Sequence, residues 1–203
     1  MTTTNQRTVR LVQLALFTAI IAVMNFTPIG YIQFTGIAIT LLGIPVTVGA
    51  IFLGPVSGAI LGAVFGITSF ARCFGLDPFG AVLLGINPVL TFILCMIPRI
   101  LMGWLTGLIF QGMKKIDRTK NIAYAVTNLA GPLLNTVLFM GTLVLFFYHN
   151  TEFSEQFVVG TGATNAIAFI IAAVGINAIV EAGTCFVMGT AISKVLDMAY
   201  KSK

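Results

Sequence analysis

Five polar side chains lie inside long apolar stretches of the sequence, where polar groups are rare and usually functional. They are Arg99, Glu181 and the three asparagines Asn128, Asn135 and Asn177. The guanidinium of an arginine carries a planar fork of donors that suits a carboxylate or a phosphate. An asparagine side chain both donates and accepts, which suits the hydroxyl and amide groups of a ligand. The set therefore indicates a binding site for a small polar anion.

The spacing of these residues predicts that they come together. Arg99, Asn135 and Asn177 fall at nearly one depth of three successive apolar stretches. Asn128 and Asn135 are seven residues apart, and Asn177 and Glu181 are four apart, so each pair shares a helix face. We predict the polar floor of a pocket, with all five as substrate-binding residues. The alternative is a buried ion pair of Arg99 and Glu181 that only holds two helices together.

The composition shows what must position these side chains. The chain has 203 residues, of which 58% are hydrophobic and 8% charged, and its mean hydropathy is +1.02. Soluble domains carry about 25% charged residues. The composition excludes a water-soluble enzyme and a disordered chain, and it indicates an all-α integral membrane protein. We expect one domain over 1–203, a bundle of six transmembrane helices at about 9–29, 36–53, 55–70, 88–110, 122–148 and 165–192.

The helix breaks follow from local signals. The uncharged stretch 31–71 is too long for one membrane-spanning helix, and Gly54-Pro55 is the strongest breaker inside it. The short apolar segment 78–86 is rich in glycine and is predicted as a loop that dips toward the membrane. The polar segment 149–164 is predicted as an external loop.

The basic residues predict the orientation. With six helices, nine of the eleven Lys and Arg residues fall on one side, namely Arg7, Arg10, Lys114, Lys115, Arg118, Lys120, Lys194, Lys201 and Lys203. Cytoplasmic loops carry the excess of basic residues in membrane proteins. We therefore expect a multi-pass protein of a bacterial or archaeal cell membrane, embedded in the lipid bilayer, with both termini cytoplasmic. The net charge of +5 does not indicate a nucleic-acid partner.

Motifs for catalysis or metal binding are absent from the sequence. It has no G-x-x-x-x-G-K-[ST], H-E-x-x-H or G-x-S-x-G motif. Its three cysteines form no C-x-x-C pair, and one histidine cannot supply a usual zinc site. We expect no enzyme activity, no metal and no cofactor.

Small residues repeat at helical spacing in two places. Gly54, Gly58, Gly62 and Gly66 form a stripe that allows another helix backbone to approach closely, and packing inside the bundle is its simplest explanation. Ala15 and Ala19 form a weaker pair in the cytoplasmic half of the first helix. They pack inside the bundle or form a docking face for a partner membrane protein.

Several segments together resemble a known family, and the resemblance covers nearly the whole chain. They are Ala15-x-x-x-Ala19, the run Ile44–Pro55, the ladder Gly58/Gly62/Gly66 and the sequence I-P-R-I-L-M-G at 97–103. The chain resembles the substrate-binding (S) components of energy-coupling factor (ECF) transporters. D-P-F-G at 77–80 and the 97–103 sequence look most like the pantothenate members.

The resemblance implies a vitamin-binding subunit of an ABC-type uptake system. Its partners would be a membrane T component and two cytoplasmic ATPases, and Ala15 and Ala19 would be the docking surface. Pantothenate suits the polar residues, because Arg99 can bind its one carboxylate and the asparagines its hydroxyls and amide. The alternatives are an S component for riboflavin or folate, and a membrane scaffold or enzyme subunit whose polar residues are structural.

Overall fold

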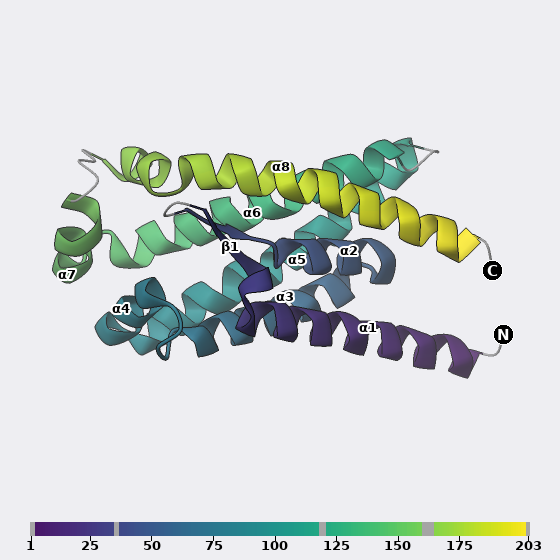
Figure 1. Ribbon diagram of the computed structural model, residues 1–203, viewed down its shortest axis with the longest axis horizontal. Coiled ribbons are helices and arrows are strands. Elements are labelled where there is room, and N and C mark those ends of the chain that lie inside the picture. Colours follow the sequence, from purple (N-terminus) through teal and green to yellow (C-terminus); the bar gives the residue numbers. More distant parts are fainter. Residues whose placement is uncertain (1–2, 35–36, 118–120, 160–164, 202–203) are drawn as a thin grey trace.

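The computed structural model describes residues 3–34, 37–117, 121–159 and 165–201 of the chain. Nearly all of this part is helical (Figure 1). In chain order the elements are α1 (Thr3–Phe26), η1 (Pro28–Gly30), β1 (Tyr31–Phe34), β2 (Ile37–Thr40), α2 (Gly43–Leu53), α3 (Pro55–Arg72), α4 (Pro78–Ile86), α5 (Pro88–Ile116), α6 (Asn121–Phe147), α7 (Thr151–Phe153), η2 (Ser154–Val158) and α8 (Ala166–Lys201).

Within the described part of the chain, five helices are long and apolar enough to cross a membrane, and α2 is a shorter apolar helix of 11 residues. The five spans lie in α1, α3, α5, α6 and α8. This arrangement confirms the predicted helical membrane bundle. The described ends of the chain lie together at one end of the bundle, and α4 and α7 lie at the opposite end (Figure 1).

Proline and glycine mark two helix boundaries, between α2 and α3 and at the start of α5. Gly54 separates α2 from α3 with φ +88°, a backbone conformation that favours glycine. Pro55 and Pro88 then begin α3 and α5, at positions where the missing N–H of proline costs nothing. The side chain of Asn87 accepts hydrogen bonds from the N–H groups of Val89 and Leu90 and so caps α5.

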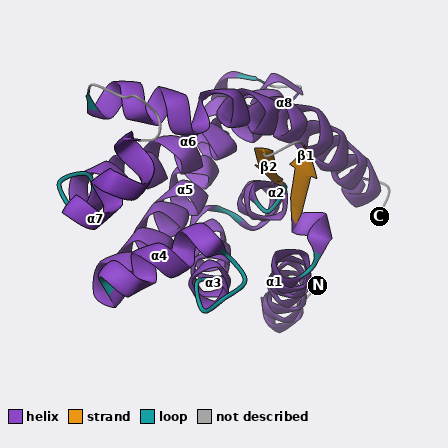
Figure 2. Cartoon of the chain, turned by 60° about the vertical axis from the view of Figure 1, so that its left-hand side comes forward, coloured by secondary structure: helices purple, strands orange, loops and turns teal. Residues whose placement is uncertain are grey.

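The segment before α2 differs from the prediction. The helix expected over 36–53 begins at Gly43, and β1 and β2 form an antiparallel hairpin in which Tyr31 pairs with Thr40 and Phe34 with Ile37. Figure 2 shows this hairpin between α1 and α8. An 11-residue helix is about 16 Å long, roughly half the hydrocarbon thickness. Pairing between the two strands supplies part of the backbone hydrogen bonds that the shortened helix leaves unmade.

Two segments that were predicted as loops are also helical in part. The segment 78–86 forms α4, with Pro78 in its first turn, and the expected loop 149–164 contains α7 and η2. The carbonyl oxygen of the Asn150 side chain accepts from the N–H of Phe153 and caps α7. Both short helices pack over the end of the bundle opposite the termini (Figure 1).

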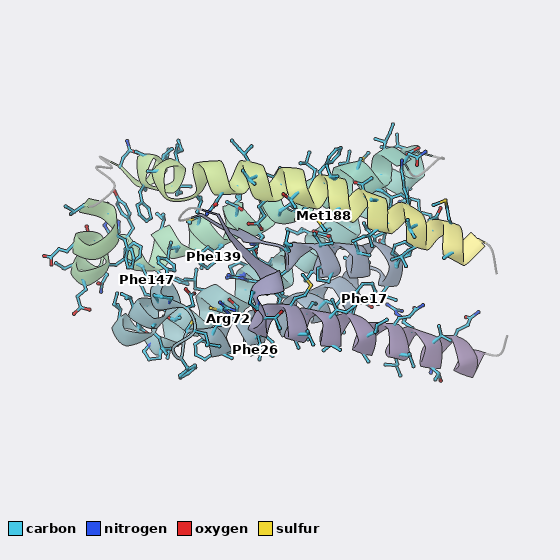
Figure 3. All side chains as sticks on the ribbon, viewed as in Figure 1. Phe17, Phe26, Arg72, Phe139, Phe147 and Met188 are labelled. Atoms are coloured by element: carbon cyan, nitrogen blue, oxygen red, sulfur yellow. The ribbon has the colours of Figure 1, made fainter. Side chains whose placement is uncertain are left out.

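The helix α1 is largely exposed and is attached at both ends by arginine side chains. Arg10 donates to the carbonyl of Leu53 at 2.7 Å and to the hydroxyl of Ser57 at 3.0 Å, at the junction of α2 and α3. At the other end Arg72 of α3 donates to the carbonyl of Asn25, and Figure 3 shows Arg72 beside the end of α1 that carries Phe26. The exposed apolar side chains between these two points are suited to lipid or to a partner helix.

The glycine stripe of α3 packs against the backbone of α5. A Cβ atom built on Gly58 would lie 2.3 Å from the carbonyl oxygen of Gly103, and one on Gly62 would lie 2.1 Å from that of Arg99. The facing Gly103 is equally constrained, because its Cβ would lie 2.1 Å from the Gly58 carbonyl oxygen. Only glycine allows this approach, so the stripe sets the distance between the two central helices.

We predict that Gly58→Ala destabilises the protein by about 1–3 kcal/mol, because the two backbones must separate to admit one methyl group. Gly112→Ala in α5 is the matched control, since a Cβ there meets nothing within 4 Å. Thermal unfolding in detergent measures both variants. A native-like melting temperature for Gly58→Ala would contradict the predicted backbone contact.

Candidate functional site

A cavity opens in the half of the bundle that carries α4 and α7. Its outer chamber has a volume of about 530 Å³ and is bordered by Asp77, by Phe79 of α4 and by Phe157 of η2. An inner chamber of about 160 Å³ ends at Thr136, Ala178 and Glu181. The two chambers share a wall formed by Thr40, Arg99, Asn135, Phe139, Met140, Val174 and Asn177. The structure thus brings four of the five predicted substrate-binding residues to one site.

Arg99 supplies the positive charge of this wall and is 7% exposed. One terminal nitrogen donates to the carbonyl of Leu94 at 2.7 Å. Its guanidinium carbon lies 4.3 Å from the ring centre of Phe139 and 5.6 Å from that of Phe65, within the range of cation–π attraction. These contacts fix a permanent charge beside the cavity, in a protein interior where its attraction for an anion is strong.

Asn135 of α6 and Asn177 of α8 contribute carbonyl oxygens to the shared wall. Both Oδ1 atoms are buried and have no hydrogen-bond partner among the described residues. Buried polar atoms without a partner are uncommon in native structures and usually mark an unfilled polar site. The two oxygens can each accept a hydrogen bond from a hydroxyl or amide group of a ligand.

Glu181 lies one helical turn beyond Asn177 and borders the inner chamber only. It is 8% exposed, and its carboxylate accepts a hydrogen bond from the backbone N–H of Thr40 at the end of β2. This contact joins the hairpin to α8. It also gives the hairpin a defined position at the wall, where Thr40 borders both chambers.

Asn128, the fifth predicted residue, is not among the residues that line either chamber. It is fully buried and donates to the carbonyl of Tyr124 at 2.9 Å and to the hydroxyl of Ser193 at 3.2 Å. The hydroxyl of Thr47 lies 3.3 Å from its Oδ1. Asn128 therefore joins α6 to α2 and α8, and its polar atoms serve helix packing.

Several cavity residues were not predicted. Ser69 and Asp77 border the outer chamber, and the aromatic side chains Phe79, Phe157 and Phe169 form much of its wall. The ring of Phe79 lies 5.0 Å from that of Phe157 in an edge-to-face arrangement. In Figure 3, the cavity residue Phe139 lies in the half of the bundle near α4 and α7. The sequence contains 17 phenylalanines, so composition alone does not show which of them line the cavity.

Ala15 and Ala19, the predicted docking pair, are both exposed on α1. Their neighbours Leu11, Leu16 and Val23 are also exposed. The structure thus leaves this helix face accessible, whereas packing inside the bundle would bury it.

A bundle of apolar helices that encloses a buried, charged cavity defines a membrane protein that binds a small polar molecule. The family model of the ECF transporter substrate-specific component matches residues 9–192, and the chain belongs to this family. It is a transport component and not an enzyme. It is 29% identical to the pantothenate transporter PanT of Leuconostoc mesenteroides, over 95% of this chain and 94% of the relative. It is 35% identical to the pantothenic acid transporter PanT of Lactococcus lactis, over 66% of this chain and 71% of the relative.

The two asparagines on α6 should affect stability differently. We predict that Asn128→Ala destabilises the ligand-free protein by about 1–3 kcal/mol, because Ser193 and Thr47 lose a buried partner. Asn135→Ala should cost clearly less, since its Oδ1 has no partner to lose among the described residues. Thermal unfolding without ligand compares the two variants. Equal losses of stability would show that Asn135 is also a packing residue.

Proposed function

We propose that this chain is the pantothenate-binding S component of an ECF transporter. The observation that carries the proposal is the shared wall of the cavity, which holds Arg99 together with Asn135 and Asn177, whose carbonyl oxygens have no partner among the described residues. The relatives named as pantothenate transporters support the choice of ligand.

Pantothenate matches the wall group by group. It carries one carboxylate, one amide and two hydroxyls, and a branched dimethyl carbon lies between the hydroxyls. Arg99 can pair with the carboxylate, and Asn135 and Asn177 can accept from the amide and a hydroxyl. The apolar side chains of Phe139, Met140 and Val174 face the same space and can contact the methyl groups. Glu181 is an acceptor in the inner chamber.

The proposed orientation places the cavity toward the outside of the cell. The N- and C-terminal ends of the chain carry basic residues and lie at the end of the bundle remote from α4 and α7 (Figure 1). Basic segments favour the cytoplasmic side. A vitamin would therefore enter past Asp77 and the phenylalanine side chains that line the outer chamber. A membrane T component and two cytoplasmic ATPases would supply the energy for its transport.

Binding of pantothenate by the purified chain tests the proposal directly. A ligand that binds only the native state stabilises it by RT ln(1 + [L]/Kd), so a thermal-shift screen over B vitamins should single out pantothenate. Riboflavin and folate are the matched comparisons. A shift with either of them and none with pantothenate would replace the proposed ligand.

We predict that Arg99→Gln weakens pantothenate binding about 10- to 150-fold, because a hydrogen bond to a charged group contributes about 1.5–3 kcal/mol. Arg99→Lys should also bind more weakly, since it keeps the charge but loses the planar fork. Pantothenol, which has an alcohol in place of the carboxylate, should bind the native protein poorly and lose much less affinity on the same substitution. Calorimetry measures the affinities.

The ion-pair alternative for Arg99 predicts a different result. In that case Arg99→Gln would leave Glu181 uncompensated, and the double variant Arg99→Gln/Glu181→Gln would regain both stability and pantothenate affinity. Rescue of affinity in the double variant would therefore remove Arg99 from the proposed ligand site.

The exposed alanines are proposed to contact the T component. We predict that Ala15→Trp/Ala19→Trp abolishes uptake by cells and preserves pantothenate binding by the isolated chain, because bulky side chains prevent close helix approach. Leu145→Trp is the control, since Leu145 is 73% exposed on α6 at the opposite end of the bundle. If the double tryptophan variant also loses binding, the pair supports the fold instead of docking.

A further inference from the structure

The inner chamber places an acid beyond the positive charge of the site. We propose that Glu181 is a specificity-determining residue, which accepts a hydrogen bond from the terminal hydroxyl of the ligand and excludes ligands phosphorylated at that hydroxyl. The inference rests on the proposed function and assigns the direction in which pantothenate lies in the cavity.

The charges of the cavity are ordered along its length. Asp77 borders only the outer chamber, Arg99 borders both chambers, and Glu181 borders only the inner chamber. An anionic group is therefore attracted to the middle of the cavity and repelled from its two ends. A ligand whose carboxylate pairs with Arg99 must point an uncharged end toward either acid.

The inner chamber suits the hydroxyl end of pantothenate. Its volume of about 160 Å³ corresponds to about five water-sized groups. That end of the vitamin consists of the branched carbon, its two methyl groups, a methylene and the hydroxyl. Met140, Val174 and Ala178 provide apolar walls for the methyl groups. The inner chamber can thus enclose the hydroxyl end of pantothenate, whereas the outer chamber is larger than this end requires.

Glu181 has acceptor capacity left for a ligand. An ionised carboxylate offers about four lone-pair sites and no donor. The backbone N–H of Thr40 occupies one of these sites. Because Asn177 lies one turn before Glu181, a chain of acceptors runs from the shared wall into the inner chamber. A ligand hydroxyl can donate a hydrogen bond to these acceptors, whereas a ligand group that only accepts cannot.

A phosphate at the same position would be strongly disfavoured. It carries a charge of about −1.5 to −2 at neutral pH and would lie against the Glu181 carboxylate in a buried chamber. Among the described residues that line this chamber, Arg99 has the only cationic side chain, and it pairs with the ligand carboxylate. No second cation in this lining could therefore compensate the charge of the phosphate.

Three ligands test the inference on the purified chain: pantothenate, 4′-phosphopantothenate and 4′-deoxypantothenate. The native protein should bind the phosphorylated ligand at least about 100-fold more weakly than pantothenate. Glu181→Gln should reduce this ratio of affinities at least about tenfold. The substituted side chain still offers an oxygen that can accept the hydrogen bond from the Thr40 N–H. Removal of the hydroxyl should weaken binding to the native protein about tenfold and to Glu181→Gln by about threefold or less, as charge-assisted hydrogen bonds are the stronger ones.

The acid of the outer chamber supplies the matched control. Asp77→Asn should leave the ratio of pantothenate to 4′-phosphopantothenate affinity unchanged. If Asp77→Asn narrows the gap and Glu181→Gln does not, the ligand lies in the opposite direction and the inference is overturned. A native protein that binds both ligands equally also overturns it, while the proposed function stands. Failure of the native protein to bind pantothenate at all overturns the proposed function instead.

A second variant keeps the test valid if Glu181→Gln does not fold. Ala178→Val reduces the inner chamber without changing its charge. It should weaken pantothenate binding several-fold and leave the affinity for N-propionyl-β-alanine unchanged, since that ligand keeps the carboxylate and amide but lacks the branched hydroxyl end. Equal effects on both ligands would show that the hydroxyl end lies elsewhere.

Discussion

A guanidinium held within the membrane is the constraint on which the site depends. Placing an arginine inside a membrane helix is costly unless the charge is turned toward protein or a polar cavity and is compensated there. Here the backbone carbonyl of Leu94 and the ring of Phe139 contact Arg99 directly. Gly62 of α3 packs closely against the backbone of α5 at Arg99. The packing that stabilises the bundle thus also holds Arg99 at the cavity.

The hairpin before α2 shows how a short helix can be accommodated in such a protein. Irregular backbone is tolerated at membrane depth only where it is covered by protein or lines a cavity. The strands β1 and β2 pair part of their backbone groups with each other, and the N–H of Thr40 bonds to Glu181 of α8. Thr40 therefore reaches the wall of both chambers.

Asn128 and Asn135 show why residue type and spacing do not define a role. They share a face of α6, and both are polar groups in an apolar helix. Asn128 lies where α2 and α8 approach α6, so the hydroxyls of Thr47 and Ser193 reach its side chain. Two turns further along, the helices leave the cavity between them, and the Oδ1 of Asn135 has no partner among the described residues.

The class of protein, the helix break at Gly54-Pro55, the helix that starts near residue 88 and the candidate polar residues could all be predicted from the sequence. They depend on composition, on local backbone chemistry and on the cost of polar groups in lipid. The pairing of β1 with β2 could not be predicted, since a short apolar run rich in β-branched residues is compatible with a helix or a strand. The contribution of Asp77, Ser69 and the phenylalanines to the cavity, and the separation of Asn128 from it, were decided only by the tertiary structure. These features depend on which helices approach one another, and that is set by contacts between residues far apart in the chain.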